Sequence, residues 1–139
     1  MPQDRVLTIH DYYDGPRRGV AEFEGRPHIY EAEFDHSADE YGDTYFLTPV
    51  ESSLLNLILE DWAIWCRWDE ARARGEVNMN SHPALPVERQ RHEEIQRLIG
   101  DQFKTDPSNR KRYRATFFTP PEHRGTWNGT LVHWERDDA

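Results

Sequence analysis

The chain has 139 residues and a formal net charge of −9 at pH 7, from 26 Asp and Glu against 17 Lys and Arg. This length suits a single core, and we expect residues 1–139 to form a single domain. Although 31% of the residues are charged, five Trp, six Tyr and six Phe supply enough apolar surface to exclude a disordered chain.

Features that would direct the protein to a membrane or a secretory route are missing from the sequence. There is no stretch of about 18 apolar residues, and MPQDRVLTIHDYY at the start lacks the basic and apolar regions of a secretion signal. The single cysteine, Cys66, cannot form an internal disulfide. We therefore expect a cytoplasmic protein with no membrane span.

The charges are unevenly spread along the chain. From Pro27 to Cys66 there are nine acids and no Lys or Arg, whereas from Pro83 to Arg114 eight bases face five acids. The sequence therefore predicts a molecule with one anionic region and one weakly cationic region.

The N-terminal third predicts strands. Val6–Tyr13 ends at the turn Asp14-Gly15-Pro16, and Gly19–Phe23 and Arg26–Phe34 flank the two-residue loop Glu24-Gly25. That loop sets Ala21 opposite His28 and Val20 opposite Ile29. Alternation then predicts one core face, made of Ala21, Phe23, His28, Tyr30, Ala32 and Phe34.

The middle of the chain predicts two helices. After an acidic loop (Asp35–Asp43) and a short strand (Thr44–Leu47), Thr48-Pro49-Val50-Glu51 has the form of a capping box with proline at the first helical position. The first helix should end near Arg74, with Gly75 as its stop. A second helix should run from Pro86 to Lys104, with one apolar stripe formed by Val87, Ile95, Leu98, Ile99 and Phe103.

Two further strands, Tyr113–Phe118 and Thr130–Trp134, complete the chain. The order of elements predicts an α+β fold: an antiparallel sheet of about five or six strands, with two helices inserted before the last two strands.

The first helix is unusually apolar around its circumference. Its apolar residues between Leu54 and Trp68 span about 220° of the helical wheel, so the helix must be covered on more than one side. Either the rest of the chain covers it, or the flank made by Leu57, Ile64 and Trp68 is open to a partner. A second copy of the chain on that flank would make a homodimer.

Asp61 lies inside this apolar arc. An unpaired buried carboxylate is costly, so Asp61 needs a partner such as an indole N–H, Arg72 or a histidine from the sheet. It is therefore either half of a structural pair or a functional carboxylate.

Recognised catalytic and metal-binding motifs are absent. The seven histidines form no HExxH pair, there is no CxxC, and no Gly-rich phosphate loop or GxSxG stretch occurs, so we expect no metal and no cofactor. An enzyme remains open but is not favoured. The alternative hypothesis is a small-molecule-binding or hydrolytic domain using Asp61, His28, Tyr30 and His10 in a cleft between sheet and helices.

The run Arg110–Arg114 is the one basic cluster that contains an aromatic residue. Strand alternation would divide it between two faces, so the run is expected to solvate an edge strand or to pair with the acidic loop. We therefore do not expect a nucleic-acid partner, because phosphate binding needs a contiguous basic face.

The favoured hypothesis is a protein-interaction module that binds a protein partner with a basic surface, as an inhibitor or immunity protein would. Acids would steer the encounter, and Tyr41 and Trp68 would anchor it. The acids expected in this role are Glu31, Glu33, Asp35, Asp39, Glu40 and Asp43.

Overall fold

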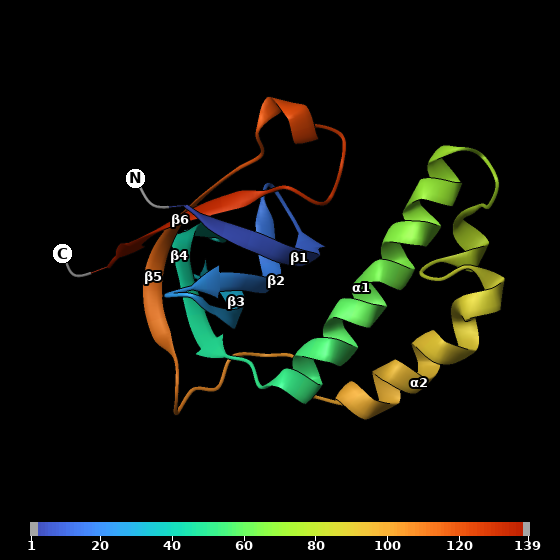
Figure 1. Ribbon diagram of the computed structural model, residues 1–139. Coiled ribbons are helices and arrows are strands. Elements are labelled where there is room, and N and C mark those ends of the chain that lie inside the picture. Colours follow the sequence, from blue (N-terminus) through green and yellow to red (C-terminus); the bar gives the residue numbers. More distant parts are fainter. Residues whose placement is uncertain (1–2, 138–139) are drawn as a thin grey trace. The chain divides into compact units, whose positions relative to one another are not determined.

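The computed structural model describes residues 3–137 and contains six strands and two α-helices (Figure 1). The elements are β1 (Asp4–Tyr12), β2 (Pro16–Phe23), β3 (Arg26–Asp35), β4 (Glu40–Pro49), α1 (Ser52–Ala73), α2 (Arg89–Ile99), β5 (Lys111–Phe118) and β6 (Leu131–Arg136). Three short 3₁₀ turns lie at Met79–Ser81, Pro86–Glu88 and Pro121–His123. The α+β class and the insertion of two helices before the last two strands are confirmed.

The chain divides into two compact units. The barrel unit comprises the residues up to Val50 and those from Lys104 onward, and it holds all six strands. The helical unit, Glu51–Phe103, holds α1 and α2. Within residues 3–137, no helix is long and apolar enough to cross a membrane.

The sheet closes into an antiparallel barrel in the order β1-β2-β3-β4-β5-β6. Closure comes from the pairing of β1 with β6, in which Asp4 lies opposite Val132 and Arg5 opposite Leu131. Because β5 pairs with both β4 and β6, it is not an edge strand. The prediction that the basic run covers an edge was therefore wrong.

The β2–β3 hairpin follows the predicted register, with Ala21 opposite His28 and Val20 opposite Ile29. Its loop residues have φ values of 52° at Glu24 and 75° at Gly25, the left-handed conformation that a tight primed turn requires. On the predicted core face, Ala21, Phe23, His28 and Tyr30 are buried, while Ala32 and Phe34 are half-buried. Val20 and Ile29 on the opposite face are also buried, so the hairpin has no solvent face at this level.

Aromatic side chains pack against one another in the barrel unit. The ring of Phe117 lies 5.2 Å from that of Tyr45, 5.6 Å from that of Tyr30 and 6.0 Å from that of Trp134. The Tyr30 hydroxyl donates to the carbonyl oxygen of Thr8 at 2.9 Å. Tyr30 and Tyr45 are buried and Phe117 and Trp134 are half-buried, so these rings join the aliphatic side chains of the barrel core.

The start of α1 differs from the prediction. Glu51 is the N-cap, and its carboxylate accepts from the backbone N–H of Leu54 at 2.9 Å. Thr48 and Pro49 belong to β4, where the Thr48 hydroxyl donates to the Asn109 carbonyl and accepts from the Asp106 N–H. The capping-box prediction was wrong because sheet pairing and these contacts already engage Thr48.

The end of α1 is as predicted. Gly75 has φ of 77°, and the N–H groups of Gly75 and Glu76 donate to the carbonyls of Arg72 and Ala71, which satisfies the last turn of the helix.

The second helix is shorter than predicted. Regular α-helix runs only from Arg89 to Ile99, and Gly100, with φ of 55°, ends it. Ile95 and Ile99 are buried, whereas Val87 is 88% exposed and Leu98 is 53% exposed. The predicted stripe was therefore wrong at Val87 and Leu98, because Val87 precedes the helix and Leu98 faces solvent.

The helical unit buries much of the apolar arc of α1. Ile64 and Trp68 are 1% and 2% exposed, and Leu57 is half-buried. The indole N–H of Trp68 donates to the Ser81 hydroxyl at 2.9 Å, and its ring meets that of His82 edge-on at 4.7 Å. Trp62 and Trp65 stack at 5.2 Å. Two residues of the predicted open flank, Ile64 and Trp68, are therefore covered within the chain, and the third, Leu57, is half-buried.

Candidate functional site

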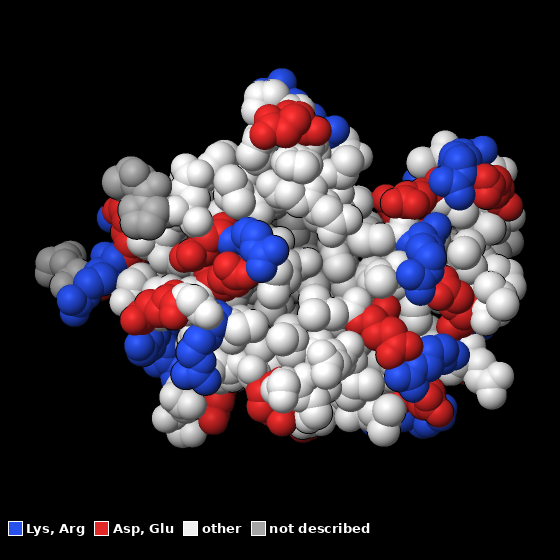
Figure 2. Space-filling model, viewed as in Figure 1, with Lys and Arg blue, Asp and Glu red and all other residues white. Residues whose placement is uncertain are grey.

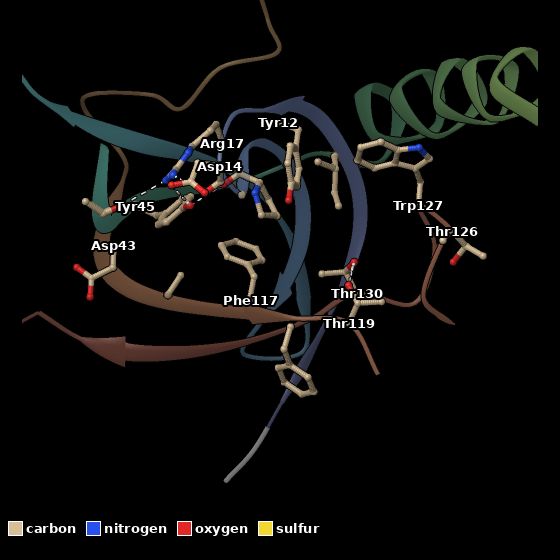
Figure 3. A pocket seen from close by; sticks show the side chains of 17 residues that line it. Tyr12, Asp14, Arg17, Asp43, Tyr45, Phe117, Thr119, Thr126, Trp127 and Thr130 are labelled. Atoms are coloured by element: carbon tan, nitrogen blue, oxygen red, sulfur yellow. Dashed lines mark hydrogen bonds between the residues drawn. The ribbon is translucent and has the colours of Figure 1, made fainter. Parts of the chain in front are cut away.

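A cavity of about 670 Å³ opens at one end of the barrel (Figure 3). It is lined by the β1–β2 turn, the first part of β4, the last part of β5 and the loop between β5 and β6. In an antiparallel barrel these strand ends all meet at the same rim. The volume lies within the range of pockets that hold small organic molecules.

Five aromatic residues contribute to the wall of the cavity. Tyr12, Tyr45, Phe117, Phe118 and Trp127 line it. Trp127, on the β5–β6 loop, meets the ring of Tyr12 edge-on with centroids 5.6 Å apart. The sequence places Trp127 between Gly125 and Gly129, whose φ values of 86° and 107° allow the loop to turn back over the rim.

Arg17 places a guanidinium group at the rim (Figure 3). Nε donates to the Tyr13 carbonyl at 2.7 Å, and Nη2 donates to the Asp14 carbonyl at 2.8 Å. Nη1 donates to the Tyr45 hydroxyl at 3.2 Å and more weakly to the Gly42 carbonyl at 3.4 Å.

These acceptors are all neutral, and no described carboxylate lies within ion-pair distance of Arg17. Its positive charge is therefore held in place without a counter-ion.

The β1–β2 turn explains this position. Asp14 and Gly15 have φ values of 53° and 120°, so the chain reverses sharply. This reversal points the carbonyl groups of Tyr13 and Asp14 at the side chain of Arg17. Tyr45 fixes the turn from β4 by donating its hydroxyl to the Pro16 carbonyl at 2.5 Å. Burial raises the pKa of Tyr45 and the neighbouring Arg17 opposes that shift, so the phenol stays neutral and able to donate at physiological pH.

Two carboxylates also line the cavity, those of Asp14 and Asp43. Asp43 pairs with Arg114 at 3.3 Å, while Asp14 is exposed in the turn. The rim thus offers a fixed cation beside acids, which favours a ligand carrying one negative charge over a polyanion.

The acids predicted to steer a partner are divided by the fold. Glu31 accepts from the N–H and hydroxyl of Thr105, both at 2.6 Å. Glu33 pairs with Arg112 at 2.7 Å, and Asp35 accepts from Ser37 and Ala38 in its own turn. The basic strand β5 therefore pairs with acids of β3 and β4. Asp43, the partner of Arg114, lies in the predicted acidic loop Asp35–Asp43, whereas Glu33, the partner of Arg112, precedes that loop. On the face in Figure 2, acidic and basic side chains lie next to one another.

Four of the six acids expected to bind a partner are exposed: Asp35, Asp39, Glu40 and Asp43. The half-buried ring of Tyr41 lies under Arg17, with the guanidinium carbon 4.6 Å from its centroid. Trp68 is only 2% exposed and offers no surface to a partner. The prediction of Trp68 as an anchor was wrong because the segment around Ser81 and His82 covers it.

The alternative catalytic set is not gathered at this cavity, which none of its four members lines. Asp61 belongs to the helical unit, where it accepts from His92 Nδ1 at 2.6 Å and Gln96 Nε2 at 2.8 Å. Its partner is thus a histidine of α2, not of the sheet.

The other three residues belong to the barrel unit, and each has a hydrogen-bond partner there. His28 Nδ1 lies 2.9 Å from the Arg26 carbonyl, His10 Nδ1 lies 3.1 Å from the Thr8 hydroxyl, and Tyr30 donates to the Thr8 carbonyl. Burial raises the pKa of Tyr30 well above its usual value, so this phenol is not a ready proton donor in catalysis.

His10 should make stability depend on pH. Burial, with a smaller contribution from the charge of Arg18, lowers the pKa of His10 from 6.5 to about 4. Between these values the unfolded chain binds more protons than the folded one, so His10 lowers the free energy of unfolding as pH falls from 6.5 to 4, by about 3 kcal/mol at most. Urea unfolding at pH 7.5, 6, 5 and 4 measures this loss.

The matched variant is His10→Gln, which cannot titrate. Its unfolding free energy should fall less steeply than that of the original chain, with a residual slope from His28, whose pKa burial also lowers. A constant difference between the two proteins at all four pH values would contradict the role of His10.

The sequence predicted the turn Asp14-Gly15-Pro16, but it gave no functional role to Arg17, Tyr12 or Trp127. The available signals were an arginine pair directly after a reversing turn and a tryptophan between glycines. Neither signal shows that these segments meet.

Among residues 3–137, no group of three or more His, Cys, Asp or Glu side chains is placed to hold a metal ion. Comparison with protein-family models, with curated proteins and with solved structures found no match to this chain.

Proposed function

We propose that the barrel mouth binds a small planar molecule carrying one negative charge. The observation that carries this proposal is Arg17, a guanidinium fixed by neutral acceptors at the rim of an aromatic cavity. The proposal retains the small-molecule-binding class expected as an alternative from the sequence, with different residues and at a different place.

The hydrogen bonding of Arg17 leaves capacity for a ligand. A guanidinium has five N–H groups. The described residues accept from Nε, from Nη1 and once from Nη2, so one N–H on Nη2 remains to donate. A carboxylate or phosphodiester oxygen is the acceptor that gains most from such a donor, because the bond is charge-assisted. The aromatic wall would hold the planar part of the same ligand.

Isothermal titration calorimetry with benzoate, indole-3-carboxylate and the methyl ester of AMP tests the proposal. Arg17→Gln is expected to weaken binding of the best of these anions by roughly tenfold to a hundredfold, the range for loss of a hydrogen bond to a charged group. The matched control is Arg18→Gln, since Arg18 is the next residue, pairs with Asp11 and does not line the cavity.

A neutral ligand tests how much of the affinity depends on the negative charge of the ligand. Benzamide should bind more weakly than benzoate to the original chain and should lose little affinity on Arg17→Gln. Thermal unfolding of the variant checks that loss of the contacts to Tyr13 and Asp14 has not unfolded the turn. Failure of all three anions to bind, or unchanged affinity in Arg17→Gln, would refute the proposal.

A second candidate, the protein-interaction module, is supported by the exposed side chains near the same rim. Tyr12 and Tyr13 are 60% and 73% exposed, and Asp39 and Glu40 are exposed acids. Oligolysine in the same titration is the probe for a basic partner. Binding lost on Asp39→Asn with Glu40→Gln, and unchanged on Arg17→Gln, would favour this candidate. Both candidates are proposed for a cytoplasmic protein, because the single cysteine, Cys66, cannot form a disulfide within the chain.

A further inference from the structure

A second cavity, of about 330 Å³, adjoins the first at the same part of the barrel. It is lined in part by Tyr13, Ala32 and Tyr41, and we call it the outer groove. Tyr12 and Arg17 line both cavities. The two hollows therefore meet at these two side chains.

Two pairs of aromatic rings border the cavities. Trp127 and Tyr12 form the pair at the barrel cavity, with centroids 5.6 Å apart, and Tyr13 and Tyr41 form the pair at the outer groove, with centroids 6.4 Å apart. Arg17 links the two pairs, because its guanidinium lies over the Tyr41 ring and its Nε donates to the Tyr13 carbonyl.

The exposure of these rings also needs an explanation. Tyr12 and Tyr13 are the two most exposed aromatic side chains among the large hydrophobic residues of the described chain. Consecutive exposed aromatic residues that border two cavities are typical of a surface that becomes covered on binding.

We propose that the ligand of this site has two planar groups joined by one singly charged bridge, with a dinucleotide joined by a phosphodiester as the chemical class. One base would occupy the barrel cavity, the second would stack in the outer groove on Tyr13, and the phosphodiester would accept from Arg17. This inference rests on the proposed function of the barrel mouth. It adds the outer groove and the second planar group.

The surrounding charge limits the length of the ligand. Asp11 and Glu31 line the outer groove, where Arg18 pairs with Asp11 at 2.8 Å. Asp14 lines the barrel cavity, and the chain carries a net charge of −9. One phosphodiester matches the guanidinium of Arg17, whereas a further phosphate at either cavity would lie near the carboxylates of Asp11 or Asp14. Stacking of bases on aromatic rings is tolerant of base identity, so no particular base is specified.

Calorimetric titration with the dinucleotide ApA and with the methyl ester of AMP tests the inference. Both ligands carry one phosphodiester charge, and ApA has a second adenosine where the ester has a methyl group. ApA is expected to bind at least about tenfold more tightly, the factor that one stacked base supplies. Tyr13→Ala should remove that advantage and leave the affinity for the methyl ester unchanged.

Trp127→Leu is the matched variant, because Trp127 lines only the barrel cavity. This substitution should weaken the binding of both ApA and the methyl ester. Since Tyr13 is exposed, Tyr13→Ala should fold normally, and thermal unfolding verifies this.

The outcomes separate this inference from the function on which it rests. Equal affinities for ApA and the methyl ester, or a Tyr13→Ala variant that keeps the advantage of ApA, would overturn the two-group ligand and leave the barrel site intact. Binding of benzoate or indole-3-carboxylate without binding of either nucleotide would do the same. If no anion binds, both the inference and the proposed function fail.

Discussion

Gly19→Ala is expected to lower the free energy of unfolding of the barrel unit by roughly 3 kcal/mol or more. A Cβ at this position would lie 2.2 Å from the carbonyl oxygen of Thr8 and 2.9 Å from its carbonyl carbon. These are backbone atoms of β1, the strand paired with β2, so relief of the clash requires the two strands to move apart.

Gly19 also leaves space for Tyr30. The two residues are opposite each other in the β2–β3 pairing, and the added Cβ would lie 2.7 Å from the Tyr30 hydroxyl oxygen. That hydroxyl crosses β2 to donate to Thr8 on β1, a buried hydrogen bond that the substitution would displace. Urea unfolding followed by near-ultraviolet circular dichroism, which reports the aromatic core, measures the loss.

Gly42→Ala is the matched control, because nothing lies within 4 Å of a Cβ added there. It should change stability by less than about 1 kcal/mol, with any gain arising from reduced freedom of the unfolded chain. If Gly19→Ala were as stable as Gly42→Ala, the close approach of β1 to β2 at this point would be wrong.

Asp61→Asn is expected to destabilise the helical unit by about 1–3 kcal/mol, the cost of leaving a buried donor or acceptor unsatisfied. The two carboxylate oxygens of Asp61 accept from His92 and Gln96, so they tie α1 to α2. An asparagine has one acceptor oxygen and would direct an NH₂ group at one of the two donors. Hydrogen exchange of the amides of residues 89–99 should accelerate accordingly.

Glu60→Gln provides the comparison, because Glu60 also joins α1 to α2 but does so in an exposed pair with Arg91 at 2.6 Å. Exposed pairs contribute about 0–1 kcal/mol, so this change should have little effect. Equal and small effects of the two variants, together with lost ligand binding in Asp61→Asn, would show instead that Asp61 is a functional carboxylate.

Local patterns predicted the parts of the fold that depend on neighbouring residues. The Glu24-Gly25 turn determined the register of β2 against β3, since a two-residue primed loop permits only one pairing of the strands that it joins. The end of α1 also follows from local geometry. Gly75 takes a left-handed conformation after the last turn, and this allows backbone N–H groups to donate to the last carbonyls of the helix.

Local patterns gave wrong predictions where residues distant in the sequence form hydrogen bonds with the same side chain. Thr48 has the sequence features of a helix cap, but its hydroxyl contacts the segment around Asp106 and Asn109, some 60 positions later. The N-cap is therefore Glu51. Asp61 was expected to find an indole N–H, Arg72 or a histidine of the sheet, and the fold supplied His92 and Gln96 of α2.

The sequence by itself determined the fold class, the β2–β3 register, the end of α1 and the need for a partner at Asp61, because each depends on backbone geometry or burial that a few adjacent residues dictate. Only the tertiary structure decided that β1 pairs with β6 and that Arg17, Tyr12 and Trp127 surround one cavity. Those contacts join residues more than 100 positions apart, and no short-range pattern encodes which distant strands pair.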